Sequence, residues 1–428
     1  MTATNSPRTL RLWRGLMIFP VALLLGGLLV GCESLLDVDN PAAVTADFLE
    51  QPENAPLLVE SAVADFECAF GQYIAAGGLI GNELWDGQLG AALWPYDRRS
   101  FDESGGLYAT TTCSGATGQW VAVYQSLSTA VQQADYALEV IEAGGAEVPN
   151  AAALTATAHA YGGYGRLLLG EGMCSAAING GPELTSQEIF ALAEAELTAA
   201  MTGGGSDITN MALVGRARAR LNQGNTAGAL DDAQAVPAGF RMNAAYSSAS
   251  GRSANKIYRH SNRFEFSSIE DNFHNLSWKG VADPRVDVTD QGRLTAGDDL
   301  TPFWTQNKYT SEDSPIPIAR WAEAQLIIAE VQGGTTAVNI INALHTAAGL
   351  PAYDPATDGP ILDHIMQERE RELFLESHHL YDIIRFNKPL HPAVGTPYQE
   401  TGAKGGSYGS VTCLPLPLVE RDNNPNIP

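Results

Sequence analysis

The chain has 428 residues, of which 45% are hydrophobic and 17% are charged, so it is long enough to bury a large core. Acidic residues number 49 against 25 basic residues, which gives a formal net charge of −24. Such a surface repels nucleic acids and anionic lipid headgroups, and both are excluded as partners held by charge.

Residues 1–31 have the pattern of a bacterial lipoprotein signal peptide. Three arginines precede an apolar run, Leu16 to Val30, that is too short for a comfortable membrane span. The run ends in the letters LVGC, which resemble a lipobox, and this resemblance implies cleavage before Cys32 and lipidation of its sulfur. An ordinary signal peptide with an incidental cysteine is the alternative. Glu33 is not the aspartate of the inner-membrane retention signal, so an outer-membrane destination is permitted.

Two stretches have the apolar spacing of amphipathic helices, about residues 116–236 and about residues 318–386. Glycine runs break the first stretch into segments, and Thr185 with Glu188 has the spacing of a capping box at the start of one of them. Helix pairs with Ala and Gly at their expected crossings resemble tetratricopeptide (TPR) packing, although no strict repeat of about 34 residues is present. The expected fold class is therefore mainly α: a TPR-like helical scaffold with long irregular loops and a few short strands.

Two loop-rich regions, about residues 80–117 and about residues 240–316, interrupt the helices. They hold aromatic residues among Gly, Asp, Asn and Ser without a helical period, so irregular loops and short strands are expected. Sugars present C–H faces that stack on aromatic rings and hydroxyls that pair with polar side chains, so these loops are the expected place for ligand binding. The candidate ligand-binding residues are Trp85, Trp94, Tyr96, Tyr108, Trp278, Trp304 and Tyr309.

For each of these aromatic residues, burial between loop and scaffold is the alternative, because large aromatic side chains are on average well buried. Trp120 and Trp321 lie on helical stripes, and both are expected in the core.

Four cysteines follow Cys32, at positions 68, 113, 174 and 413. An even number in an exported chain suggests two disulfides, with three possible connectivities. We favour Cys68–Cys113, which closes the shorter loop and leaves Cys174–Cys413 to tie the C-terminal tail to the helical body. Four buried free thiols are the alternative.

The segment from Ile361 to Phe386 is expected to be a helix with charges on its buried face. Arg369, and either Glu372 or Glu376, fall on the stripe that its apolar residues form. A buried charge is tolerated only when it is paired and hydrogen-bonded. The charges therefore form either a solvated face with pairs three residues apart, or a clamp on neighbouring helices.

The same segment resembles the C-terminal signature of SusD/RagB-type outer-membrane lipoproteins, and four further motifs follow that family's order. Asp283-Pro284-Arg285 matches its DPR motif, ARWAEAQLIIAEV resembles its R-x-AE-x-x-L-x-x-AEA helix, and NALHTAAGLPAY and LPLPLVERDNNPNI resemble two later motifs. The residues of the helical motifs at matching positions are Arg320, Glu323, Glu330, Glu368, Arg369, Glu372, Leu373, Glu376, Asp382 and Arg385.

The chain departs from the family pattern at three places. Ser377 stands where the family has a glycine, His379 replaces an arginine, and Leu344-His345 lacks the arginine of the family's RAG turn. Serine does not adopt positive φ freely, so the segment is expected either to continue as one helix or to begin a new turn with Ser377 as N-cap. These changes put local ion pairs in doubt and leave the fold unaffected.

The resemblance implies a ligand-binding domain over residues 32–428 that is lipid-anchored to the cell outer membrane and faces the outside. It also implies a role: capture of an oligosaccharide, or of a peptide, and delivery to a SusC-like TonB-dependent transporter. Neither enzymatic activity nor a cofactor is implied. A lipid-anchored glycan hydrolase and a purely structural helical adaptor are the alternatives.

The motifs of common enzymes are missing from the sequence, which has no HExxH, no P-loop and no GxSxG. His364 with Glu368, and His378 with Asp382, are spaced four apart and could share a metal ion, but two ligands do not make a site. The acidic stretch 283–299 does not have the spacing of an EF-hand loop. We therefore expect no catalytic residues, no cofactor and no metal.

Overall fold

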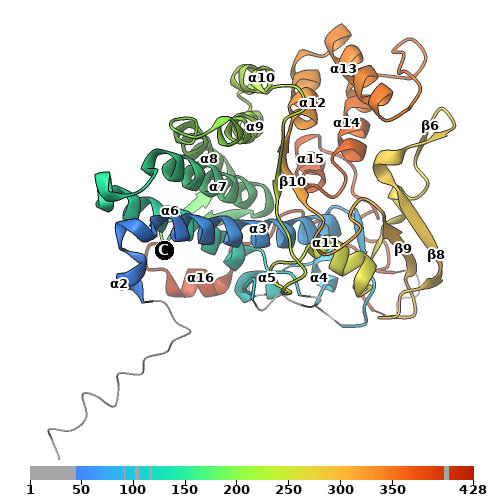
Figure 1. Ribbon diagram of the computed structural model, residues 1–428. Helices are drawn as coiled ribbons and strands as arrows, with labels where there is room; N and C mark the ends of the chain where they lie inside the picture. Colours follow the sequence, from blue (N-terminus) through green and yellow to red (C-terminus); the bar gives the residue numbers. More distant parts are fainter. Residues whose placement is uncertain (1–44, 91, 102–105, 115–117, 119, 400–403) are drawn as a thin grey trace, which may run out of the picture. The chain divides into compact units, whose positions relative to one another are not determined.

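Helices that pack each on the next form the first part of the fold (Figure 1). Alanine and glycine along these helices allow close packing, as in the Ala-rich sequence of α7. The series runs through α3 (Ala55–Ile80), α6 (Tyr124–Gly144), α7 (Ala151–Gly172), α8 (Ser186–Ala199), α9 (Ser206–Asn222) and α10 (Thr226–Ala235).

The computed structural model describes residues 45–90, 92–101, 106–114, 118, 120–399 and 404–428. The expected signal peptide and Cys32 lie outside these residues. The chain divides into two units, Met1–Phe48 and Leu49–Pro428, and helix α2 (Ala46–Leu49) begins in the first. In the described part of the chain, no helix is both long and apolar enough to cross a membrane.

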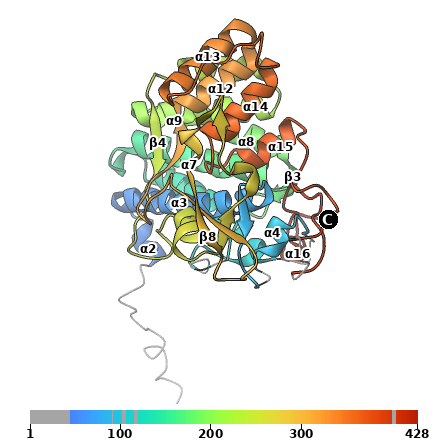
Figure 2. The same cartoon turned by 90° about the vertical axis from the view of Figure 1, so that its right-hand side faces the viewer.

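A second group of helices follows the loop-rich middle of the chain and is drawn in orange and red in Figures 1 and 2. Helix α12 packs on α10, α13 and α14, so it joins the two groups. The group contains α12 (Trp321–Gln332), α13 (Gly334–Ala347), α14 (Ile361–Glu372) and α15 (His379–Arg385), and α16 (Leu418–Asn423) follows near the C-terminus.

Short antiparallel strand pairs, and not a continuous sheet, organise the loops. Trp85 in β1 lies opposite Ser268 in β5. The pairs are β1 (Leu84–Asp86) with β5 (Ser267–Ile269), β2 (Ser175–Ala177) with β3 (Glu183–Thr185), β4 (Arg241–Ala244) with β10 (Ile316–Arg320), β6 (Ser277–Trp278) with β7 (Val281–Ala282), and β8 (Val288–Leu294) with β9 (Pro302–Gln306). Short helical turns complete the loops: α4 (Trp94–Asp97), α5 (Leu107–Thr110), α11 (Lys256–Tyr258), η1 (Pro52–Asn54), η2 (Gly145–Glu147), η3 (Arg259–Arg263), η4 (Asp271–Phe273) and η5 (Pro284–Val286).

The expected fold class is confirmed: a mainly α, TPR-like scaffold carries irregular loops and a few short strands. The capping box is also present, because the Thr185 hydroxyl accepts the amide of Glu188 at 3.3 Å and the Glu188 carboxylate accepts the amide of Thr185 at 2.8 Å. Two disulfides, Cys68–Cys113 and Cys174–Cys413, have the favoured connectivity, with Cα atoms 6.1 and 5.0 Å apart.

Two expectations for helices were wrong. The helical stretch expected from about residue 116 begins only at Tyr124, and Trp120 before it is 44% exposed and lies outside the core. The segment 361–386 is two helices, because α14 ends at Glu372 and α15 begins at His379. Between them Ser377 has φ +77°, a left-handed conformation that glycine adopts most easily.

Arg218 of α9 holds this turn in place. Its guanidinium donates to the carbonyl oxygen of Ser377 at 3.1 Å and lies 3.0 Å from Nε2 of His378. Ser377 is thus neither inside a continuous helix nor an N-cap. The break depends on a contact from a distant helix, and for that reason local sequence patterns do not show it.

Close packing between α7 and α9 depends on Gly215. A Cβ atom at this position would lie 2.6 Å from the ring of Tyr164, whose hydroxyl donates to the carbonyl of Met211 at 3.0 Å. The Tyr164 ring is buried, so it has little room to move. Gly215 therefore fixes how near the two helices approach.

We predict that Gly215→Ala lowers the free energy of unfolding by about 1–3 kcal/mol, because the methyl group forces the Tyr164 ring away. Without the clash, alanine inside a helix would raise stability by about 1 kcal/mol. Urea denaturation of the two proteins measures the difference, and Gly205→Ala, with no atom within 4 Å of the added Cβ, is the control. A Gly215→Ala variant as stable as the wild type would contradict this packing.

Candidate functional site

Two of the hollows on the described surface differ clearly in their lining side chains. One has a volume of about 270 Å³ and is lined by charged side chains, and the other has about 320 Å³ and is lined partly by aromatic and proline side chains. We call them the ionic hollow and the Trp85 cavity. The side chains that line each hollow indicate whether it has a structural role or could bind a ligand.

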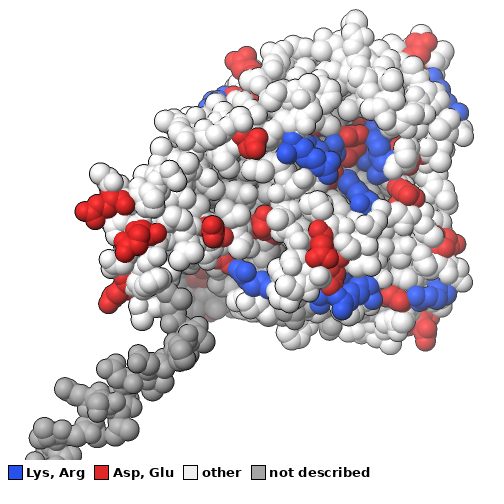
Figure 3. Space-filling view, viewed as in Figure 1, with Lys and Arg blue, Asp and Glu red and all other residues white. Residues whose placement is uncertain are grey.

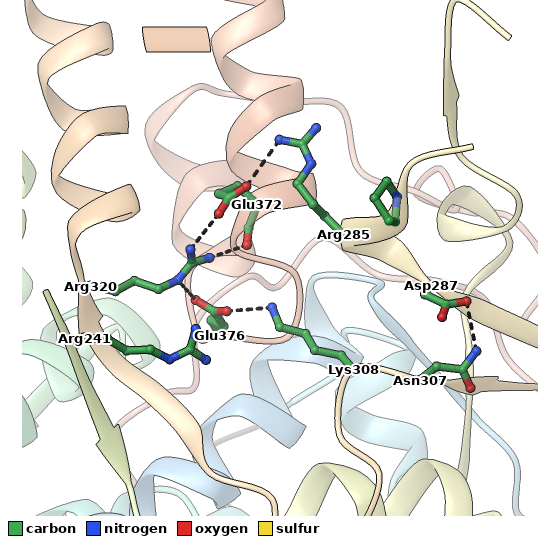
Figure 4. Close-up of a pocket in the computed structure, with 9 residues that line it drawn as sticks. Arg241, Arg285, Asp287, Asn307, Lys308, Arg320, Glu372 and Glu376 are labelled. Carbon is green, nitrogen blue, oxygen red and sulfur yellow. Dashed lines mark hydrogen bonds and ion pairs between the residues drawn. The ribbon is translucent and has the colours of Figure 1, made fainter. Parts of the chain in front are cut away.

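Side chains from several elements converge in the ionic hollow. Figure 3 shows basic and acidic atoms side by side at its mouth, and Figure 4 shows the side chains pointing toward one another. Arg320 ends β10, Lys308 follows β9 and Arg285 lies in η5, while the acids come from the end of α14 and the turn after it. The ionic hollow therefore brings together residues that are far apart in the sequence.

Nearly all charge in this hollow is used by ion pairs. The Arg320 guanidinium lies 2.6 Å from Glu372 and 2.7 Å from Glu376, and Lys308 Nζ lies 2.6 Å from Glu376. Arg285 lies 2.8 Å from Asp283. Of the four cations that line the hollow, only Arg241 has no anionic partner among the described residues and donates instead to Asn243, so the hollow offers a ligand little free charge.

Ion pairing overcomes the cost of burial for Glu376. Burial alone would raise the pKa of this carboxyl, but Arg320 and Lys308 outweigh burial and hold the pKa at about 2. The same balance holds the pKa of Glu368 at about 2, where His345 and Arg285 oppose burial. These carboxylates therefore stay charged at neutral pH. Of the two alternatives for the segment 361–386, its charges form the clamp on neighbouring elements and not a solvated face.

The Trp85 cavity has the mixed chemistry of a ligand site. Trp85 of β1 lines it together with Leu300 and with Pro302 at the start of β9. Glu270 and Asp271, which follow β5, add carboxyl groups. Its remaining wall is a stretch of the C-terminal tail that contributes His391, Pro392, Thr396, Pro397, Gln399 and Tyr408.

Three side chains that line the Trp85 cavity carry a buried polar atom with no hydrogen-bond partner among the described residues. These atoms are Nε1 of Trp85, Oε2 of Glu270 and Oε1 of Gln399. An unsatisfied buried group costs about 1–3 kcal/mol. A hydroxyl-rich ligand that reaches these atoms would recover part of that cost.

Burial raises the pKa of Glu270 well above its ordinary value, and the neighbouring Asp97 and Asp271 raise it further. Burial thus favours the uncharged form of Glu270, and that form can donate as well as accept a hydrogen bond. Asp271 and His391, by contrast, are well exposed and lie 2.8 Å apart. The cavity thus offers both donors and acceptors, as polyhydroxylated ligands require.

A buried network beneath the cavity fixes Trp85 and the tail. Lys404 Nζ lies 2.9 Å from a carboxylate oxygen of Asp86 and 2.9 Å from one of Asp298, and all three side chains are fully buried. Tyr398 donates to Asp97 at 2.9 Å, and Asp97 also accepts the amide of Asp86 at 2.9 Å. Since Asp86 follows Trp85 directly, the tail and β1 are held together next to the indole.

Of the seven predicted aromatic residues, the structure places Trp85 in this cavity. Tyr96, Tyr108 and Tyr309 are buried, and their hydroxyls donate to the carbonyl oxygens of Val121, Pro415 and Leu375. In the structure their rings offer a ligand almost no surface, in agreement with the alternative of burial between loop and scaffold.

The remaining three candidates, Trp94, Trp278 and Trp304, are half-buried and do not line the cavity. Trp94 donates from Nε1 to the carbonyl of Gln88, and Trp304 stacks on His274 with ring centroids 3.7 Å apart. Trp278 packs on His364 at 4.5 Å. The sequence analysis grouped these residues by composition, whereas the fold disperses them.

The sequence analysis missed the residues that complete the cavity: Glu270, Asp271, His391, Gln399 and Tyr408. Three of them, His391, Gln399 and Tyr408, belong to the C-terminal tail, in which the sequence analysis named no binding residue. The available signal was that this tail also holds tyrosines among Gly, Ser and Thr. That is the composition by which the other two loop regions were selected.

Residues 297–427 match the family model described as the SusD family. The C-terminal part of the chain is thus similar to the SusD family. The five motifs found in the sequence lie in or just before this matched region, and charged residues from them form the ion pairs of the ionic hollow. No curated protein matches the chain.

Solved structures share the SusD fold along most of the chain. A SusD superfamily protein from Bacteroides vulgatus has 15% identity and a TM-score of 0.65, covering 88% of this chain and 97% of its own. NanU from B. fragilis has 15% identity and a TM-score of 0.64, covering 91% and 98%. Surface glycan-binding protein A from Bacteroides thetaiotaomicron, solved with laminarihexaose, has 14% identity and a TM-score of 0.64, covering 86% and 97%.

We predict that Glu376→Gln lowers the free energy of unfolding by about 3 kcal/mol at neutral pH, because two buried cations lose their shared anion. The pKa of Glu376 is about 2 in the folded chain and is about 4.3 in an unfolded chain. Its contribution is therefore complete above pH 4.3 and is lost as the pH falls through 2. Urea denaturation between pH 7 and pH 2.5 should show wild type and variant converging.

Glu370→Gln is the matched control, since Glu370 is a quarter exposed and pairs with Lys388 at the surface. It should cost no more than about 1 kcal/mol. A stability difference for Glu376→Gln that stays constant across the acid range would contradict the assigned ion pairs.

Proposed function

We propose that the mature chain is a lipoprotein on the outer face of the outer membrane that captures an oligosaccharide in the Trp85 cavity and delivers it to a SusC-like TonB-dependent transporter. The observation that carries the proposal is the cavity itself. An indole, proline walls and three unsatisfied polar atoms share one hollow. Aromatic surface with a few convergent polar groups is the usual composition of a sugar site.

The similar proteins support this proposal by their names. One carries the name surface glycan-binding protein and was solved with a glucan oligosaccharide. At 14% identity the likeness establishes the fold alone, so the ligand class comes to this chain through the cavity. A peptide is the second ligand class that the same cavity chemistry admits.

Capture without turnover fits the cavity better than hydrolysis does. Glu270 and Asp271 are adjacent carboxyl groups, but Glu270 is buried with a raised pKa, and Asp271 is exposed and paired with His391. Steady release of reducing ends by the purified chain, abolished by Glu270→Gln, would instead support the hydrolase alternative.

We predict that Trp85→Ala weakens oligosaccharide binding at least tenfold, a change of about 1.4 kcal/mol, because the cavity loses its aromatic wall. Calorimetry on a ligand identified in a glycan and peptide panel measures this change. Trp120→Ala removes an exposed tryptophan outside the cavity and should leave affinity unchanged. Equal affinities for Trp85→Ala and the wild type would exclude this cavity as the binding site.

We predict that Cys32→Ala releases the protein from membranes, because the lipid-bearing sulfur is absent. Detergent phase partitioning of cell extracts measures the release, with Ser34→Ala as the matched control that stays in the detergent phase. The wild-type protein, isolated in mild detergent, should carry a large β-barrel protein with it. Recovery from outer membranes with no barrel attached would count against the transporter part of the proposal.

A further inference from the structure

A second cluster of chemically active side chains lies away from the Trp85 cavity, between α13 and α14. His345 comes from α13, and His364 and Glu368 come from α14. All three side chains are at least 97% buried. The spacing of His364 and Glu368 was visible in the sequence, and the fold adds His345 as a third group.

Three potential ligand atoms converge in this cluster. Nε2 of His345 lies 2.8 Å from Oε1 of Glu368 and 3.4 Å from Nε2 of His364, and the latter lies 3.7 Å from the same oxygen. A triangle with these sides has its centre about 1.9 Å from every corner, close to the usual zinc–ligand distance of about 2.0–2.2 Å. A single ion could thus contact all three atoms with little movement of the chain.

The hydrogen bonds of His345 also indicate a cation between His345 and Glu368. Nδ1 of His345 lies 2.7 Å from the carbonyl oxygen of Pro351, which can only accept, so Nδ1 carries the proton. In the neutral ring Nε2 then has a lone pair, and it faces the Glu368 carboxylate at 2.8 Å. Two acceptors this close in a buried place require positive charge between them, which either a second proton or a metal ion supplies.

We propose that His345, His364 and Glu368 bind a zinc ion that fastens α13 to α14. Two imidazoles and one carboxylate are a common zinc ligand set, and the remaining coordination position would take water. The site replaces our expectation of no metal. It does not depend on the proposed function, since none of the three residues lines the Trp85 cavity.

The groups around the cluster fit this role. Metal-binding histidines usually donate their other ring nitrogen to a carbonyl or carboxylate, as His345 does to Pro351. Arg285 donates to both oxygens of Glu368, at 2.6 Å to Oε2 and at 3.2 Å to Oε1, which orients the carboxylate. The rings of Trp278 and Tyr353 lie 4.5 and 4.3 Å from that of His364 and shield the cluster.

The test measures metal in the mature chain after incubation with zinc chloride and gel filtration. Elemental analysis should find about one zinc per chain in the wild type and less than about 0.2 in His345→Gln and His364→Gln. The matched control is His391→Gln, because His391 belongs to another cluster, with buried Glu270 and exposed Asp271, whose ligand atoms are also close together. That variant should retain its zinc.

A cobalt-substituted wild-type protein removes any dependence on variants that fold poorly. It should show the visible absorption of low-coordinate cobalt bound by imidazole, and EDTA should abolish this absorption and lower the melting temperature. Wild-type protein with less than about 0.2 zinc would overturn the proposal and leave a protonated histidine as the bridge. Loss of zinc in His391→Gln alone would place the ion at the surface cluster, and zinc bound equally by all variants would also overturn the proposal.

Discussion

Buried ion pairs between α14, α15 and their neighbours are the constraint on which the second half of the fold depends. Arg369 lies 2.7 Å from Asp382, and Asp382 lies 3.0 Å from Arg385, which also bonds to Glu330 of α12. Such pairs add little net stability over apolar packing, but loss of one partner leaves a buried charge at a cost of about 3–5 kcal/mol. They therefore select one arrangement of helices and penalise others. The loops that build the Trp85 cavity rest on that arrangement.

The helical scaffold could be predicted because its signals are local. Periodic apolar residues, glycine breaks and the capping box at Thr185 each act within a few residues. The break at Ser377 could not be predicted, because Arg218, more than a hundred residues earlier, holds its unusual backbone. The sequence predicted that charged residues of the segment 361–386 lie on its buried face. Which residues pair with them could be seen only in the folded structure.

The candidate site was harder to predict, because it is assembled from distant segments. Composition selected aromatic loops, yet it could not tell Trp85, which lines a cavity, from Tyr309, whose ring is buried. Burial of an aromatic ring is decided by what packs on it, and neither spacing nor propensity reports that. The tail residues were missed for the same reason. A stretch without periodicity does not indicate that it lines the Trp85 cavity.

The bond between Cys174 and Cys413 has a consequence for where the protein completes its folding. It joins the end of α7 to the tail segment that continues from the cavity wall, across a sequence separation of 239 residues. Cytoplasmic thiols are kept reduced. The tail can therefore be locked against the scaffold only in an oxidising compartment, once Cys413 is available for the bond. The wall that the tail contributes to the Trp85 cavity is held by a covalent bond only where disulfides form.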